Sequence, residues 1–140
     1  MSQEVTAHWV ENYTFVGKTE QHKSVIIDAA TTADSETIAP SPMDLVLLGL
    51  TGCAGIDVKL ILGKSKKSID HLEVKAIAKR RDEFPRIFTD IHLHFTVSGK
   101  DIDDKSVARA VKLSAEKYCS VSAMLEKTVN ITHDYSIRDI

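Results

Sequence analysis

The sequence predicts an α+β fold, in which apolar helices pack on β-strands, and three observations support it. Apolar and polar residues alternate over residues 72–79 and 87–97, which is typical of antiparallel strands with one exposed face. A long apolar segment at residues 42–62 begins with a helix-capping sequence. A second helical pattern follows the acidic residues 101–104, which favour the first turn of a helix. Strands and helices arranged in this way are typical of the α+β class.

The N-terminal part is predicted to be rich in strands. Residues 4–10 and 24–28 contain many Val, Ile, Thr and Trp side chains, which favour strands. Residues 12–17 are predicted to form a hairpin partner, with Gly17 at a turn. The polar residues 31–41 are predicted to form a loop.

The central helix has a clear predicted start. Ser41 is a capping residue, Pro42 suits the first helical position, and Asp44 can complete a capping box. The helix is expected to run to Leu62 and to stop at Gly63. Its residues are apolar on nearly every side, so we expect it to be buried in the middle of the molecule.

Three glycines recur in this helix at every third position: Gly49, Gly52 and Gly55. Each costs roughly 0.5–1 kcal/mol of helix stability relative to alanine. That cost is explained if another helix approaches the backbone closely beside Cys53.

Cys119 lies at a predicted break between two helical runs. The first run carries a stripe made of Val107, Ala110, Val111, Ser114 and Tyr118. Ser120 is predicted to cap a short helix at residues 121–127, and residues 127–137 are predicted to form the last strand. Free N–H groups at the start of a helix stabilise a thiolate, so we expect Cys119 to be a competent resolving or leaving thiol.

Length and composition indicate one soluble domain over residues 1–140, with a net charge of −2. This charge gives no case for binding nucleic acid or an anionic membrane. The start of the chain lacks the pattern of a secretory signal, so we expect a cytoplasmic protein. The longest apolar stretch carries Asp57 and Lys59, and we expect that it does not span a membrane.

The two cysteines, Cys53 and Cys119, are the most informative residues for function. Thiols in the cytosol are more often catalytic, metal-binding or simply buried than joined in a structural disulfide. Two thiols that meet in space can act as a pair, in which one attacks and the other resolves. For each cysteine, a small buried core residue is the alternative interpretation.

Three segments of the chain resemble the OsmC/Ohr family of thiol peroxidases, and most closely its YhfA-like branch of small bacterial proteins. They read SPMDLVLLGLTGC at residues 41–53, FPRIFTDIHLHFTVSG at 84–99 and AVKLSAEKYCSVSAML at 110–125. The resemblance covers nearly the whole chain, in order. It implies an OsmC-like fold, with antiparallel sheets wrapped around two central helices of an intertwined homodimer.

The resemblance also implies a function. Family members reduce organic hydroperoxides, so Cys53 matches the peroxidatic thiol and Cys119 the resolving thiol, with a cellular dithiol as reductant. No metal or organic cofactor is implied. In the Ohr branch an acidic residue directly follows the helix-start proline and orients an arginine from the N-terminal strands. Here that position is Met43, the acid comes one residue later at Asp44, and no arginine precedes Arg80.

Arg80, Arg81 or Arg86 would have to replace the missing guanidinium, and Arg86, which follows Pro85 at a strand entry, is our candidate, with weaker cases for the other two. Glu116, three residues before Cys119, is a possible contact for it. Asp57, four residues after Cys53, is expected to be an orienting group or a satisfied polar residue. The alternative function is a non-catalytic dimer of the same fold that binds a small ligand or senses redox state.

His92 and His94 share one face of a predicted strand, a spacing that can chelate a metal. No third ligand follows in a recognisable pattern, so we predict no metal site there.

Overall fold

The computed structural model describes residues 1–138, and the chain divides into two compact units, Met1–Leu47 and the part that begins at Leu48. Helix α1 (Pro42–Lys64) crosses the boundary between them. The expectation of one domain over residues 1–140 stays a prediction.

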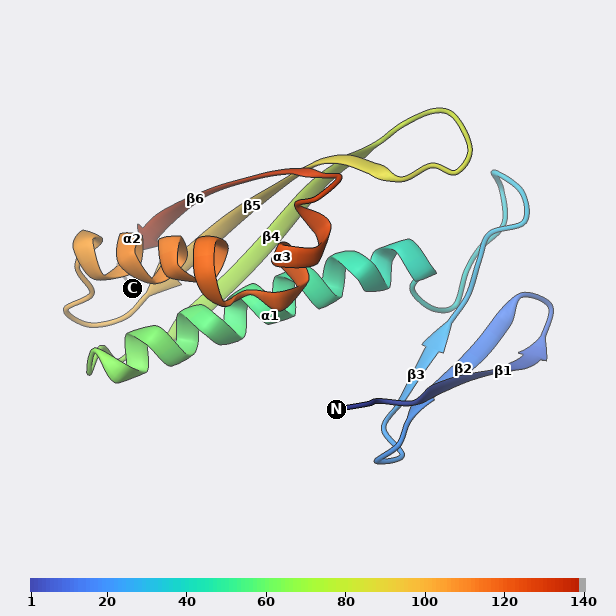
Figure 1. Cartoon of the computed structure of the whole chain (residues 1–140), viewed down its shortest axis with the longest axis horizontal. Coiled ribbons are helices and arrows are strands. Elements are labelled where there is room, and N and C mark those ends of the chain that lie inside the picture. Colours follow the sequence, from blue (N-terminus) through green and yellow to red (C-terminus); the bar gives the residue numbers. More distant parts are fainter. Residues whose placement is uncertain (139–140) are drawn as a thin grey trace. The chain divides into compact units, whose positions relative to one another are not determined.

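The N-terminal unit is a three-stranded antiparallel sheet of β1 (Val5–Glu11), β2 (Thr14–Thr19) and β3 (Ser24–Ile27), in that order (Figure 1). Asn12, with φ of 49°, lies in the β1–β2 connection, and His22, with φ of 63°, lies in the β2–β3 connection. The prediction of a turn at Gly17 is wrong, because Gly17 pairs with Ala7 and Val25 in the middle of β2.

Helix α1 starts as predicted. The amide of Asp44 donates to the Ser41 hydroxyl, and the amide of Ser41 donates to the Asp44 carboxylate, both at 3.0 Å. This reciprocal pair is the capping box expected from the sequence. The helix continues past Gly63 and ends at Lys64.

The second unit is a sheet with helices on one of its faces. Its strands are β4 (His71–Arg80), β5 (Phe88–Ser98) and β6 (Asn130–Arg138), with β5 in the middle. Figure 1 shows α2 (Asp104–Leu113), the π-helical turn η1 (Ser114–Tyr118), α3 (Ser120–Leu125) and α1 on the same side. The predicted α+β class is confirmed.

One strand pairing differs from the antiparallel sheets that we expected, because β6 runs parallel to β5 while β4 runs antiparallel to it. A parallel neighbour requires the chain to cross back over the sheet, usually through a helix. Here α2, η1 and α3 form that crossover, and they carry Cys119 across the face of the sheet.

The core of the second unit lies between α1, β5 and α2. One stripe of α1 is buried, and it consists of Leu50, Ala54, Val58 and Leu62. Alternating β5 side chains, among them Leu93 and Phe95, and α2 residues such as Val107 and Val111 are buried as well. The four-residue spacing of the α1 stripe keeps it on one side of the helix.

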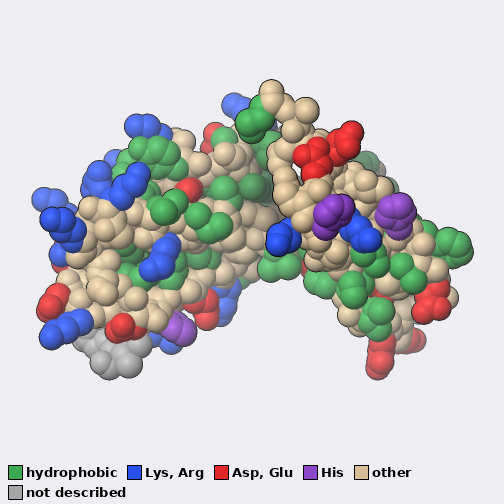
Figure 2. Space-filling view, turned by 90° about the horizontal axis from the view of Figure 1, so that it is seen from below, with side chains coloured by type: hydrophobic (Ala, Val, Ile, Leu, Met, Phe, Trp, Pro, Cys, Tyr) green, Lys and Arg blue, Asp and Glu red, His purple; other side chains and the backbone are tan. Residues whose placement is uncertain are grey.

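The remaining surface of α1 is more exposed than we expected, and apolar side chains are visible on the surface in Figure 2. Leu48, Ile56 and Leu60 are 56%, 63% and 56% exposed. The sequence pattern predicted burial all round, and the chain itself buries only one stripe. By length and composition alone α1 is also able to cross a membrane, with a mean hydropathy of 2.0 over its most apolar window, but a core helix passes the same test.

The glycines of α1 also lack close packing partners within the described residues. Among residues 1–138, and apart from the adjoining residues and backbone of α1 itself, no atom lies within 4 Å of a Cβ built on Gly49 or Gly52, and on Gly55 the nearest is a Val74 methyl at 3.3 Å. The second helix that the glycines led us to expect is therefore not supplied by the described part of this chain.

If the second helix belongs to a second copy of the chain, as the resemblance implies, we expect Gly49→Ala to weaken self-association about tenfold, because a methyl group there would obstruct the close approach of that copy. Gly63→Ala, also in α1 and also with no atom within 4 Å in the described residues, is the matched control and should leave association unchanged. Sedimentation velocity over a concentration series measures both. Unchanged association of Gly49→Ala, with a helix stabilised by about 0.8–1 kcal/mol, would contradict close packing of a second copy at this position.

Candidate functional site

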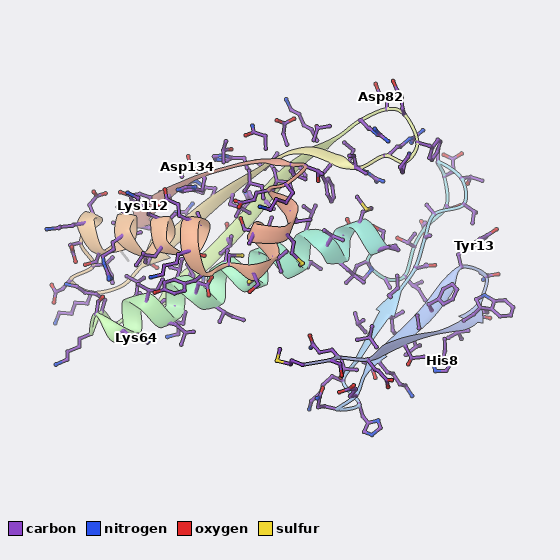
Figure 3. The ribbon with its side chains drawn as sticks, in the orientation of Figure 1. His8, Tyr13, Lys64, Asp82, Lys112 and Asp134 are labelled. Atoms are coloured by element: carbon purple, nitrogen blue, oxygen red, sulfur yellow. The ribbon has the colours of Figure 1, made fainter. Side chains whose placement is uncertain are left out.

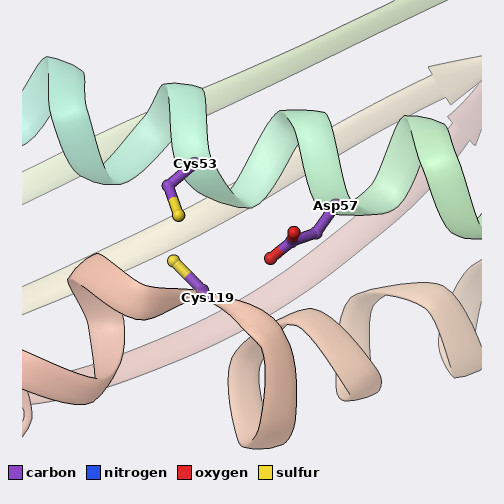
Figure 4. Close-up of side chains that lie close together, drawn as sticks. All are labelled: Cys53, Asp57 and Cys119. Atoms are coloured by element: carbon purple, nitrogen blue, oxygen red, sulfur yellow. The ribbon is translucent and has the colours of Figure 1, made fainter. Parts of the chain in front are cut away.

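The structure brings the two predicted thiols together. Cys53 lies on α1 and Cys119 lies between η1 and α3, and their sulfur atoms point toward one another (Figure 4). The two sulfurs and a carboxylate oxygen of Asp57 all lie within 4.8 Å of one another. Both cysteines are free thiols.

Asp57 joins the site because of its place on α1. It follows Cys53 by four residues, so both side chains leave the same side of the helix. The Ser114 hydroxyl donates to Asp57 Oδ2 at 3.1 Å, and it also lies 3.5 Å from the Ala54 carbonyl oxygen. Ser114 is buried, so this contact ties the start of η1 to α1.

The π-helical turn positions Cys119. Its closing hydrogen bond runs from the Cys119 amide to the Ser114 carbonyl, at 2.9 Å across five residues. Turns of this kind are rare and often occur at functional sites. The chain then becomes extended at Cys119, with φ of −73° and ψ of 104°, before α3 begins. The break that we predicted between two helical runs is confirmed.

Cys119 itself caps α3, a role that the sequence analysis gave to Ser120. The Ser122 amide donates to Cys119 Sγ at 3.4 Å, while Ser120 is the first residue of the helix. Sulfur is a weak acceptor, which is why the sequence pattern favoured the hydroxyl.

The expectation of an acidic Cys119 thiol is wrong. Burial raises the pKa of Cys119 to about 11, against the opposing effect of the Ser122 N–H group. The neighbouring Cys53 and the Asp57 carboxylate raise it further. The sequence placed this thiol correctly at a helix start but did not show that its side chain is only 4% exposed.

A cavity of about 320 Å³ opens beside Cys119. Its apolar lining includes Ala54, Leu93, Phe95 and Ile131, and its polar lining includes Glu116 and His133. Among the residues that the structure describes, no arginine or lysine lines this cavity. Glu116 therefore meets no guanidinium there, in contrast to the contact we considered.

A second cavity, of about 300 Å³, is lined by Asp57. Leu60, Ile61 and Leu113 supply apolar surface, and Lys64 and Arg109 also line it. From the sequence, Ser114 was placed only on the stripe of a helix, and Arg109 was given no role. Only the four-residue spacing of Cys53 and Asp57 was visible in the sequence.

Arg86 lies in the β4–β5 connection, with its guanidinium carbon 4.5 Å from the centroid of the Phe84 ring. The connection is braced by Arg80 Nε, which donates to the Arg86 carbonyl, and by Arg81 Nε, which donates to the Pro85 carbonyl, both at 2.6 Å. Within its own chain Arg86 is not among the residues that line the cavity at Cys119.

The histidine pair on β5 is engaged by one carboxylate of β6. His92 and His94 each contact Asp134 Oδ1, at 2.9 and 2.6 Å, and Asp134 is labelled in Figure 3. The remaining ring nitrogens contact Thr132 and Ser136. Hydrogen bonds from the two histidines lower the pKa of Asp134. These contacts occupy all four ring nitrogens.

Alkylation tests the high pKa of Cys119. In Cys53→Ser, whose only thiol is Cys119, we expect the iodoacetamide reaction rate to rise about tenfold per pH unit from about pH 7 to 9, because the thiolate fraction does so below the pKa. Mass spectrometry of quenched samples measures the rate. A rate that levels off near pH 8 would show that the effect of the helix start on the pKa of Cys119 outweighs the effect of burial. The same measurement on Cys119→Ser gives the reaction rate of Cys53 for comparison.

Several known proteins are similar to this chain in sequence, in fold or in both. The family model described as OsmC-like protein matches residues 33–134. Protein YhfA of Escherichia coli K12 is 50% identical over 129 residues, which cover 92% of this chain and 93% of that protein. A crystal structure of a hypothetical protein from Aquifex aeolicus VF5 is 28% identical with a TM-score of 0.87, covering 100% of this chain and 98% of that one. An organic hydroperoxide resistance protein OsmC from Legionella pneumophila is 16% identical with a TM-score of 0.72, covering 97% of each chain, and shares the fold. The chain belongs to the OsmC-like protein family.

Proposed function

We propose that this protein is a thiol peroxidase that reduces organic hydroperoxides, as a cytoplasmic homodimer in oxidative stress defence. The observation that carries the proposal is the pair of facing thiols, Cys53 and Cys119, beside a largely apolar cavity. Family membership supports it, since the family includes proteins named for organic hydroperoxide resistance.

The proposed reaction uses both thiols. The Cys53 thiolate attacks the distal oxygen of the hydroperoxide, the O–O bond breaks, and the leaving alkoxide takes up a proton to become an alcohol. Cys53 is then a sulfenic acid. The Cys119 sulfur attacks it, a disulfide forms, and the sulfenic oxygen leaves as water. A cellular dithiol reduces the disulfide by thiol–disulfide exchange and is itself oxidised.

The assignment of roles follows from exposure. Cys53 is half-buried and Cys119 is buried, so Cys53 is the thiol that a peroxide reaches more easily. The raised pKa of Cys119 also makes it the poorer first nucleophile. Apolar side chains such as Leu93, Phe95 and Ile131 suit the organic part of an organic hydroperoxide.

The proposed reaction needs a guanidinium near Cys53, and we propose that Arg86 of a second subunit supplies it. The Arg86 side chain is exposed at the β4–β5 connection. Among the described residues of the same chain, no arginine or lysine lines the cavity at Cys119. A positive charge beside Cys53 would favour its thiolate and orient the peroxide.

Substitution of each cysteine tests the reaction. We expect Cys53→Ser to abolish consumption of cumene hydroperoxide, because it removes the attacking sulfur. Cys119→Ser should consume about one equivalent and then accumulate a Cys53 sulfenic acid that dimedone traps, since nothing resolves it. Peroxide assay and intact-mass spectrometry measure both, and peroxide consumption by Cys53→Ser at the parent rate would refute the proposal.

Subunit mixing tests the origin of the arginine. Neither Cys53→Ser nor Arg86→Ala homodimers should turn over at more than about a tenth of the parent rate. If Arg86 acts across the interface, exchanged heterodimers of the two variants regain one complete site, and activity recovers toward half that of the parent. Activity that stays at the level of the separate variants would place the arginine in the same chain, and full activity of Arg86→Ala alone would remove it from the reaction.

A second candidate function is a non-catalytic dimer that binds a small ligand or senses redox state. The Asp57 carboxylate beside the two thiols favours it, because its negative charge helps to raise the pKa of Cys119. Survival of both thiols in excess peroxide would favour this candidate over the peroxidase.

A further inference from the structure

The cluster of Cys53, Cys119 and Asp57 holds three groups that ligate metals. We propose that, in the reduced protein, these three side chains bind one thiophilic divalent cation of the zinc type. From the sequence we expected no metal. The metal site does not depend on the peroxidase reaction.

The geometry of the cluster supports three-point binding. Tetrahedral zinc with Zn–S bonds of about 2.3 Å separates two ligand sulfurs by about 3.8 Å. The two sulfurs and the Asp57 oxygen already lie within 4.8 Å of one another, so shifts of about 1 Å or less form the site. The three side chains point toward one another in Figure 4.

The carboxylate is oriented from behind, as metal ligands usually are. The buried Ser114 hydroxyl donates to Asp57 Oδ2 at 3.1 Å. A hydrogen bond of this kind fixes the direction of a ligating carboxylate and is typical of the shell around a bound metal. Lys64 and Arg109 line the cavity on the other side of Asp57, but within residues 1–138 neither forms a salt bridge with it.

The donor set selects the class of cation. Two sulfurs and one carboxylate favour zinc, cobalt or cadmium over magnesium and calcium, which prefer oxygen ligands alone. Three protein ligands leave the fourth tetrahedral position for water or an added ligand. On binding, each thiol releases its proton to solvent and the sulfur donates a lone pair, with no change of oxidation state.

Metal binding and disulfide formation then exclude each other. Both use the Cys53 and Cys119 sulfurs, so a bound cation holds the pair reduced and a disulfide leaves only Asp57 as a ligand. Metal occupancy would thus protect the thiols from oxidation and keep them unavailable for other chemistry.

Cobalt binding tests the proposal directly. We expect reduced, metal-free protein, titrated with Co²⁺ under nitrogen, to develop a thiolate-to-cobalt charge-transfer band that saturates at one cobalt per chain. Cys53→Ser and Cys119→Ser should lose most of the band. Asp57→Asn should bind at least about tenfold more weakly, the scale expected when a group around a metal is lost.

Asp82→Asn is the matched control. Asp82 is an exposed carboxylate in the β4–β5 connection, labelled in Figure 3, and its loss should leave cobalt affinity unchanged. Far-ultraviolet circular dichroism establishes that each variant is folded. If Asp57→Asn does not fold, treatment of the parent protein with diamide is used in place of this variant. We expect both thiols to survive diamide in the zinc-loaded protein and to be lost in the metal-free protein.

Absence of the charge-transfer band, or equal cobalt affinity of Asp57→Asn and the parent, would overturn the three-ligand site. Rapid loss of both thiols to diamide in the zinc-loaded parent would overturn it as well. Peroxide consumption by the metal-free protein is measured separately, so a failed metal site and a failed peroxidase give different results.

Discussion

The hydrogen bond between Ser114 and Asp57 is the contact on which the arrangement of the site depends. Ser114 begins the π-helical turn that ends beside Cys119, and Asp57 lies one helical turn after Cys53. The contact therefore sets how the crossover segment lies on α1, and with it the approach of the two sulfurs. The bond also gives the half-buried Asp57 carboxylate a hydrogen-bond partner.

Packing of α1 provides the other half of the arrangement. Ala54 and Val58 belong to its buried stripe, and the residue just before each of them is Cys53 and Asp57. A residue one position earlier on a helix lies about 100° around the axis, at the margin of the buried face. The two functional groups consequently border the core and are half-buried, and Asp57 also lines a cavity.

Much of this could be predicted from the sequence, and the misses have physical causes. The capping box of Ser41 and Asp44 depends only on local spacing, as does the existence of the strands, so these predictions are confirmed. The parallel β6, the exposed apolar surface of α1 and the raised pKa of Cys119 depend on tertiary packing. An apolar pattern predicts that a surface is buried, but it does not show whether the same chain or another chain covers that surface.

The electrostatics of the cluster connect the proposed activity with the proposed metal. The Asp57 carboxylate opposes ionisation of Cys119, and its charge is one of the causes that raise the pKa of this thiol. No lysine or arginine from the described residues of the same chain lines the cavity at Cys119. Lys64 and Arg109 line the cavity at Asp57 instead, so a positive charge brought to the Cys119 cavity from outside the chain would favour the Cys119 thiolate. A guanidinium of a second subunit would favour one thiolate and attack on peroxide, whereas a divalent cation would bind both thiolates and prevent it.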